Sequence, residues 1–189
     1  MSTLRVNEIQ EADGSTFSRL LQVKNTNVTT TSSFTISSAN TNFAVSALDT
    51  AITSTQANSK FIFSAQVFAE INGQDNDFAY ELARVVGGTE TYFASGTGSI
   101  GNRDRVTRNL TLAYFSSENE STPSATNFSS IVDSPNVAAG TAITYRINVK
   151  STGGSPSWTF YLNRTVNDND SATYERGASW LTVMEVATT

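Results

Sequence analysis

Apolar and polar residues alternate over several stretches of this chain. Two stretches, residues 60–71 and 141–150, have an apolar residue at every second position: Phe61, Phe63, Ala65, Val67, Ala69 and Ile71 in the first, and Ile143, Tyr145, Ile147 and Val149 in the second. Neighbouring side chains of a strand point to opposite sides. Each stretch is therefore predicted to be a strand with one face in a core.

Further stretches with the same period predict strands over residues 77–86, 91–94, 106–115, 158–163 and 178–186. The last of these strands is apolar on both faces. Its apolar residues are Trp180, Met184 and Val186 on one side and Leu181 and Val183 on the other. Such a strand is expected to be covered on both sides.

Turn residues separate these stretches, and none of the stretches has a sustained helical period. The pattern predicts an all-β fold, an antiparallel β-sandwich. We favour a jelly-roll-like topology because this architecture recurs in capsid and lectin domains. An immunoglobulin-like sandwich has the same periodicity and remains an alternative. The length of 189 residues suits one domain with a short extra segment.

The first residues of the chain form that extra segment. Leu4, Val6 and Ile9 are interleaved with polar residues. A strand this short does not hold itself in water, so it is expected to pair with a neighbouring copy or with another protein. The predicted division is an extended N-terminal arm over residues 1–30, used for attachment, and a β-sandwich head over residues 31–189.

The composition excludes several classes of function. The formal net charge is −5 and the isoelectric point is about 4.7, so no nucleic-acid partner is expected. Cys and His are absent, which removes disulfides, thiolate metal sites and the usual catalytic bases and nucleophiles. The N-terminus lacks an apolar signal region, and no segment has the roughly 18 apolar residues of a membrane helix. We expect no export signal, no membrane insertion and no cofactor.

Carboxylates are the remaining catalytic candidates. A glycosidase-type pair would have to be drawn from Glu70, Glu81 and Glu90. Nothing in the sequence singles out two of them. We therefore expect a protein that is not an enzyme, and we assign no catalytic residue.

Two acidic clusters, Asp75 with Asp77 and Asp168 with Asp170, raise the question of a calcium site. Neither cluster has the Gly and the distant Glu of an EF-hand loop. Asp and Asn are also the residues that tight turns between strands select. We interpret both clusters as turns and predict no metal site, with calcium as the less favoured alternative.

Two arginines, Arg164 and Arg176, lie between the last two predicted strands, near Asp168, Asp170 and Glu175. They are candidates for an ion network, either between subunits or as a lock between the strands, because arginine forms planar bidentate pairs with carboxylates. A solvated polar hairpin is the alternative. We favour the structural lock.

Short motifs occur in a fixed order along the chain: Ser2-Thr3-Leu4-Arg5-Val6-Asn7, Ser59-Lys60-Phe61-Ile62-Phe63, Asp133-Ser134-Pro135-Asn136, Tyr161-Leu162-Asn163-Arg164 and Tyr174-Glu175-Arg176-Gly177-Ala178-Ser179. In this order they resemble a family of marine, cyanophage-type bacteriophage virion proteins. The resemblance covers residues 1–15 and 50–187. Members of that family are often longer, with fibre-like repeats between arm and head, and no such repeats are visible here.

The resemblance implies a tail-fibre or other virion structural protein with a trimeric jelly-roll head, similar in architecture to the C1q and tumour-necrosis-factor type. The last strand agrees with an oligomer, because association would bury its second apolar face. The interface candidates are Trp180, Leu181, Val183 and Met184, together with Arg164 and Arg176.

Three functions remain open at this point: a capsid decoration or cement protein, a short tail fibre or adhesin that recognises a host surface glycan, and a host-derived lectin-like module. The missing shaft favours decoration, whereas the resemblance favours a fibre-type protein. For the first two, the expected partners are further copies of the chain and other capsid or tail proteins. The expected location is the particle surface, after synthesis in the cytoplasm of a bacterial host.

Overall fold

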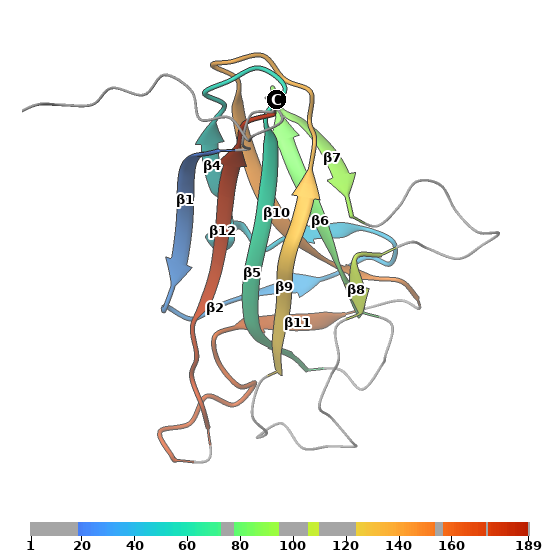
Figure 1. Cartoon of the computed structure of the whole chain (residues 1–189). Coiled ribbons are helices and arrows are strands. Elements are labelled where there is room, and N and C mark those ends of the chain that lie inside the picture. Colours follow the sequence, from blue (N-terminus) through green and yellow to red (C-terminus); the bar gives the residue numbers. More distant parts are fainter. Residues whose placement is uncertain are drawn as a thin grey trace, which may run out of the picture.

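The computed structural model of the chain describes residues 19–72, 78–94, 106–109, 124–153, 157–172 and 174–188. Their strands form two antiparallel sheets packed face to face (Figure 1). The all-β sandwich predicted from the sequence is confirmed. The strands are β1 (Leu20–Val28), β2 (Ser32–Ile36), β3 (Asn42–Ala44), β4 (Thr50–Thr53), β5 (Lys60–Ile71), β6 (Phe78–Val86), β7 (Thr89–Phe93), β8 (Arg108–Asn109), β9 (Ser124–Asp133), β10 (Ala142–Ser151), β11 (Trp158–Leu162) and β12 (Ser179–Val186), and a 3-10 helix, η1 (Ser46–Leu48), precedes β4.

Eight of these strands pair like a long hairpin wound around a core. The first sheet contains the order β1-β12-β5-β9, and the second contains β4-β10-β6-β7. Within this set the first strand pairs with the last, the second with the seventh, the third with the sixth and the fourth with the fifth. This nested pairing is the jelly roll, and it decides against the immunoglobulin-like alternative.

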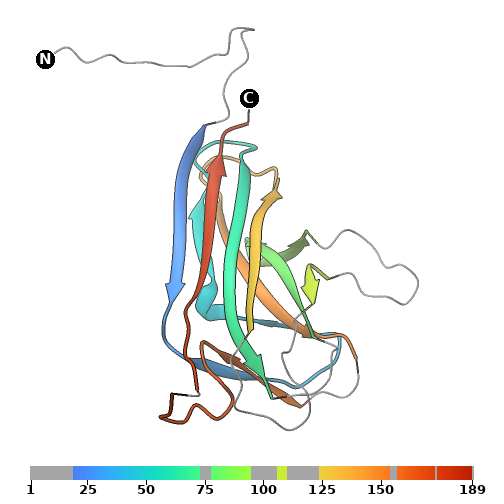
Figure 2. The same ribbon diagram turned by 60° about the horizontal axis from the view of Figure 1, so that its bottom comes forward.

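Four shorter strands extend the two sheets. β11 pairs with β2 and with the last residues of β5, and these two strands cross one end of the sandwich (Figure 1). β3 pairs with β10, and β8 pairs with β6. The β11–β12 loop lies at the end that β2 and β11 cross, whereas β1 begins and β12 ends at the opposite end (Figure 2). No helix in the described part of the chain is long and apolar enough to span a membrane.

Apolar side chains from both sheets fill the space between them. Phe63 of β5 contacts three rings, with centroid distances of 5.9 Å to Phe93, 6.3 Å to Phe128 and 6.4 Å to Tyr145. The alternation in the sequence explains this layer, because the apolar residues at every second position of residues 60–71 and 141–150, named above, are all buried.

A polar link also joins the two sheets inside the sandwich. The carboxylate of Asp133 on β9 accepts hydrogen bonds from the Arg84 guanidinium on β6 and, at 3.0 Å, from the Tyr145 hydroxyl on β10. Burial raises the pKa of Asp133, against the opposing effects of Arg84 and Tyr145. The buried Asp133 carboxylate therefore has donors from two strands of the second sheet.

The head begins earlier in the chain than expected. Residues 20–28 fall inside the segment that the sequence assigns to an arm, but they form β1, which pairs with β12 along its length. The strand is hard to recognise because an edge strand with one solvated face tolerates polar residues such as Asn25. The predicted attachment residues Leu4, Val6 and Ile9 lie outside the described residues, so their role stays a prediction.

Candidate functional site: the outer faces of the two sheets

The outer face of the first sheet carries a row of apolar residues across four strands. Val23 of β1 is opposite Met184 of β12, Met184 is opposite Ile62 of β5, and Ile62 is opposite Val132 of β9. Side chains opposite one another on antiparallel strands point to the same side and contact each other. We call these four residues the apolar row.

The apolar row is open to solvent in the single chain. Val23 is 48% exposed and Val132 is 56% exposed, and Leu20, which pairs with Val186 next to the row, is 56% exposed. The one other large hydrophobic residue that the described part of the chain exposes is Tyr92. Exposed apolar side chains thus gather on one face of one sheet, a distribution typical of an interaction surface.

The same face has very little exposed charge. Beside the row stand uncharged residues such as Asn25 and Thr182. Lys60, opposite Val186 at one end, is the exposed charged side chain among the described outward positions of the four strands. Glu70 is 2% exposed and accepts a hydrogen bond at 2.8 Å from the backbone N–H of residue 166. Depletion of charge is what distinguishes the centre of a protein interface from other surface.

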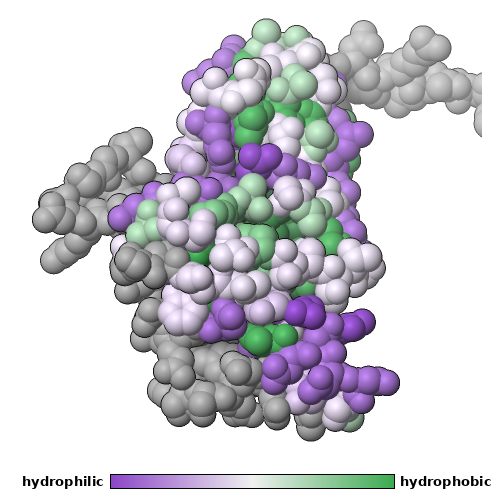
Figure 3. Space-filling model, turned by 180° about the vertical axis from the view of Figure 1, so that it is seen from behind, coloured by the Kyte–Doolittle hydropathy of each residue, from purple (hydrophilic) through white to green (hydrophobic). Residues whose placement is uncertain are grey.

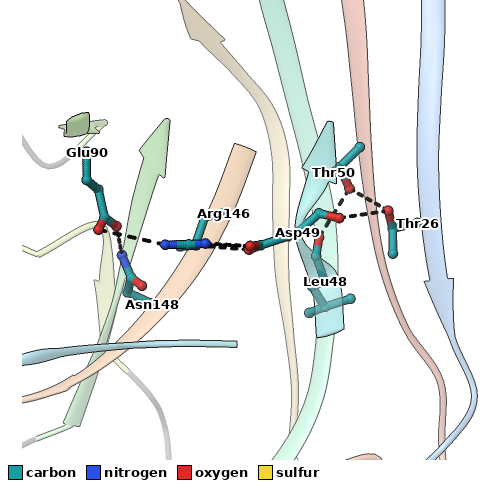
Figure 4. A network of polar contacts seen from close by, with 7 residues as sticks. All are labelled: Thr26, Leu48, Asp49, Thr50, Glu90, Arg146 and Asn148. Carbon is teal, nitrogen blue, oxygen red and sulfur yellow. Dashed lines mark hydrogen bonds and ion pairs between the residues drawn. The ribbon is translucent and has the colours of Figure 1, made fainter. Parts of the chain in front are cut away.

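The outer face of the second sheet is held together by charged and polar groups. Arg146 of β10 binds the Asp49 carboxylate through Nε to Oδ1 at 3.0 Å and Nη2 to Oδ2 at 2.5 Å, and its Nη1 lies 3.9 Å from Glu90 Oε2 (Figure 4). Asn148 donates from Nδ2 to Glu90 Oε1 at 2.6 Å. The hydrogen bond to Asp49 raises the pKa of Arg146. The Arg146 guanidinium therefore binds the Asp49 carboxylate in a bidentate manner and lies between it and Glu90.

This network continues to the first sheet. Thr50 Oγ1 donates to Thr26 Oγ1 at 2.8 Å, and Thr26 Oγ1 donates to the backbone oxygen of Asp49 at 3.3 Å (Figure 4). Thr26 belongs to β1, so these hydrogen bonds join the edges of the two sheets.

A second polar cluster lies further along β10. Asn42 of β3 donates from Nδ2 to Glu81 Oε2 at 2.8 Å, and Lys150 Nζ lies 3.9 Å from Glu81 Oε1. Burial raises the pKa of Tyr92, against the opposing effect of the Asn42 side chain. Seen from behind Figure 1, the surface is mostly hydrophilic or weakly polar, with apolar residues in small patches (Figure 3). The charges named on this face have partners within the chain.

The three carboxylates considered for catalysis lie on two different sheets. Glu81 and Glu90 belong to the second sheet, where each is bound by its own set of partners. Glu70 belongs to the first sheet and accepts the hydrogen bond described above. The structure therefore gives no reason to select a catalytic pair among them.

Arg164 and Arg176 meet on one carboxylate in the β11–β12 loop. Arg164 Nη1 lies 3.1 Å from Asp168 Oδ2, and Arg176 binds Oδ1 and Oδ2 through Nε and Nη2, both at 2.8 Å. The hydrogen bonds from Arg176 and then Arg164 lower the pKa of Asp168. Both arginines thus bind the same carboxylate within the chain, and whether they also contact another subunit stays a prediction.

The same contacts bear on the calcium alternative. Both oxygens of Asp168 face guanidinium groups, and Asp170 is exposed. No group of three acidic residues that could hold a metal occurs in the part of the chain that the structure describes. Asp75 and Asp77 lie outside it.

Asn163 is an organising residue that the sequence analysis missed. It is fully buried at the start of the β11–β12 loop and has a φ of 61°, a conformation that asparagine tolerates better than most residues. Its Nδ2 donates to the backbone oxygens of Val28 at 2.8 Å and Thr30 at 3.0 Å, and its Oδ1 accepts from Ser179 Oγ at 2.6 Å. Asn163 thereby ties the end of β1 to the start of β12.

Glu185 of β12 is a second buried anchor. Its carboxylate accepts hydrogen bonds from Gln22 Nε2 at 2.6 Å and from the backbone N–H groups of Thr55 at 2.9 Å and Gln56 at 3.2 Å. Burial opposes ionisation, but the hydrogen bonds, led by those from Gln22, Ser59 and Thr55, outweigh it and lower the pKa of Glu185 to about 2. The charge therefore holds β1, β12 and the β4–β5 loop together.

The structure divides the interface candidates of the last strand. Leu181 and Val183 are fully buried in the core, so they offer no surface to a partner, and their place in the predicted interface is corrected. Burial alternates along β12, and Trp180 and Met184 are on its partly exposed side. Of the apolar candidates, Trp180 and Met184 therefore remain.

Comparison with known proteins identifies no family. No family model matches the chain, and no curated protein matches it. Among solved structures, VP2 of infectious bursal disease virus in a subviral particle gives a TM-score of 0.40 at 11% identity, covering 97% of this chain and 46% of that chain. A structure of the Gx strain of the same virus gives 0.41 at 12% identity, covering 97% and 44%. The chain spans less than half the length of these proteins. The jelly roll is established by its own strand pairing, to which similarity at these scores adds nothing.

Proposed function

We propose that the protein is a non-catalytic structural protein of a bacteriophage particle, with a jelly-roll head that forms a trimer through the outer face of its first sheet. The contrast between the two outer faces carries the proposal: one is apolar and almost uncharged, and the other binds its own charges. The sequence resemblance to marine phage virion proteins supports the virion role. The nested strand pairing fits the head that this resemblance implies.

A second copy of the chain is the partner that the charges favour for the apolar row. Copies with a net charge of −5 repel one another at long range. Contact through the row avoids bringing carboxylates together, because Lys60 is the exposed charge at its margin. Contact through the second sheet would instead bring Glu90 and Asp49 of each copy close together. Among the described surfaces, the outer face of the first sheet is therefore the one suited to self-association.

The oligomeric state is tested by light scattering coupled to size exclusion. We expect a mass three times the chain mass of 20.3 kDa at micromolar concentration. Dilution through the dissociation constant should shift this mass toward that of the single chain. A monomer mass at all micromolar concentrations would contradict the proposal.

The virion role is tested on purified particles. We expect the protein to be present in them, with a copy number that follows the capsomers for a decoration or cement protein and a small multiple of three for a tail component. Deletion of residues 1–16 should leave the trimer intact but abolish incorporation, because these residues are the proposed anchor. Absence of the full chain from particles would exclude both virion functions.

The end of the head that carries the β11–β12 loop favours a second candidate function, recognition of a host surface glycan. The β11–β12 loop lies opposite the end where β1 begins (Figure 2), so it would point away from a particle that holds the N-terminal arm. A polar recess of about 440 Å³ there is lined by Asp168, Asn169, Asp170, Ser171, Tyr174 and Arg176. Tyr174→Ala should then reduce adsorption of particles to host cells without changing the trimer. Unchanged adsorption would contradict glycan recognition at this recess, and only the structural role would remain.

A further inference from the structure

We infer that Asn42, Glu81 and Lys150 form a self-processing site, in which the side chains of Lys150 and Asn42 condense to an intramolecular isopeptide bond and Glu81 transfers the protons. The bond joins β3 to β10 on the outer face of the second sheet. It gives a covalent staple to a chain whose sequence contains no Cys and hence no disulfide.

Strand register brings the two reacting residues together. Lys150 and Asn42 are directly opposite each other in the β10–β3 ladder. Directly opposed residues on antiparallel strands have Cα atoms about 4.5–5.5 Å apart and side chains on the same side of the sheet. On the other side of β10, Asn148 is opposite Glu81 of β6, so the carboxylate approaches the pair from the neighbouring strand.

The Glu81 carboxylate faces both nitrogen atoms of the reaction. Its Oε1 lies 3.9 Å from Lys150 Nζ, which is the nucleophile. Its Oε2 lies 2.8 Å from Asn42 Nδ2, which is the leaving group. One carboxylate is therefore placed to act as base toward the amine and as acid toward the departing ammonia.

The surroundings exclude most of the solvent from this site. The side chains of Lys150 and Glu81 are 11% and 8% exposed. The adjacent outward residues of β6, Ala79 and Ala83, are 1% and 0% exposed. Because the strands hold Lys150 and Asn42 next to each other, the reaction does not depend on a chance encounter of the two side chains.

The reaction balances without another reactant. Glu81 takes a proton from the Lys150 ammonium, and the neutral amine attacks Cγ of Asn42. The tetrahedral intermediate collapses as the Cγ–Nδ2 bond breaks, and the protons lost by the attacking nitrogen pass through Glu81 to the leaving nitrogen. The products are one secondary amide between the two side chains and one ammonium ion.

The intact mass of the purified, folded chain tests the inference directly. We expect a mass lower than that of Lys150→Arg, after correction for the substitution, by one molecule of ammonia. Trypsin should release one joined species in which Asn25–Lys60 is linked to Ile147–Arg164, with no cleavage after Lys150 because its amine is acylated. A wild-type mass that lacks the loss, or separate peptides with cleavage after Lys150, would overturn the inference.

Matched variants separate this bond from other losses of ammonia. Glu81→Gln should keep the full sequence mass because the proton carrier is gone, whereas Lys60→Arg, on the other sheet, should show the loss of ammonia. A succinimide at an asparagine would also lose ammonia, but it would persist in Lys150→Arg and would join no peptides. Since wild-type mass and peptides decide the question, a variant that fails to fold does not block the test.

Discussion

The outer faces of the two sheets are built on the same strand geometry. They differ in whether their side chains find partners within a single chain. On the second sheet, Arg146 is bound by Asp49 and approaches Glu90, and Glu81 is bound by Asn42. On the first sheet, Val23 and Val132 are about half exposed. A polar face can satisfy itself within one chain, because its groups pair side by side. An apolar row has no such partner until another surface covers it.

The largest expected effect on stability comes from disrupting the core layer that lies between the two sheets. Phe63→Ala should lower the free energy of unfolding by about 3–5 kcal/mol, because it leaves a cavity among Phe93, Phe128 and Tyr145. Denaturant unfolding of the purified protein measures this. Ile147→Val is the mild control and should cost about 0.5–1.5 kcal/mol. Equal stability of Phe63→Ala and the wild type would show that the sheets are not held by this layer.

The next effect concerns Glu185, which holds the strands of the first sheet from within. Its folded-state pKa of about 2 is below its usual value of 4.5. The carboxylate therefore stabilises the fold fully above pH 4.5, and this contribution is lost as the pH falls toward 2. Glu185→Gln should be less stable than the wild type by up to about 3 kcal/mol at neutral pH.

The pH dependence distinguishes this effect from a simple loss of packing. The stability difference between Glu185→Gln and the wild type should shrink as the pH falls from 4.5 toward 2, as measured by urea unfolding at each pH. Asp133, whose pKa burial raises, contributes in the opposite direction, but it is present in both proteins and cancels. A difference that does not change with pH would contradict the assignment of this pKa.

A charged residue in the apolar row should remove the difference between the outer faces of the two sheets. Met184→Lys should weaken self-association by at least roughly 2 kcal/mol, a factor of about 30 in the dissociation constant. Light scattering should then show monomers, with an unchanged far-ultraviolet circular dichroism spectrum. The matched control is Thr144→Lys on the second sheet, which should leave the oligomer mass unchanged. Loss of the oligomer in both variants, or in neither, would reject the row as the interface.

Breaking the polar network should have a small effect. Arg146→Met removes the bond to Asp49, but both side chains are partly exposed, at 25% and 23%. The expected loss is therefore about 1 kcal/mol or less, and it should decrease in high salt. Thermal unfolding at low and high salt measures it. A change in the oligomer mass would show that the second face also takes part in association.

Chelation is expected to have no effect. The Asp168 carboxylate is bound by two arginines rather than left for a cation, so EDTA should not change the melting temperature of the oligomer. Reducing agents should likewise have no effect on a chain without Cys. A clear drop in melting temperature with EDTA would restore the calcium alternative for the acidic clusters.

The sequence predicts best the strands in which one face is wholly apolar. The pattern over residues 60–71 coincides with β5, and the pattern over residues 141–150 differs from β10 by one residue at each end. It does not indicate β9, where register shifts opposite Phe63 and Ala65 and a φ of 53° at Ser130 interrupt the alternation. β1 is missed because its polar residues suit a solvated edge equally well.

The candidate surface is less predictable than the strands. Periodicity shows that β12 has two apolar faces but not which one points inward, so Leu181 and Val183 cannot be told from Trp180 and Met184. The apolar row takes one residue from each of four strands, and their register depends on the complete pairing of the sheet. The acidic partner of Arg164 and Arg176 could be narrowed to three neighbours, but only the loop geometry selects Asp168.

The pairing of β1 with β12 has a consequence for how the chain is made. Gln22 and Glu185, which are hydrogen-bonded, are 163 positions apart. Closing so long a loop is costly in entropy and delays these contacts during folding. β12 also lies between β1 and β5, so the row through Val23, Met184 and Ile62 does not exist until β12 has left the ribosome. Growing or prematurely terminated chains therefore lack the apolar row, and under the proposed self-association other copies join only chains synthesised at least through β12.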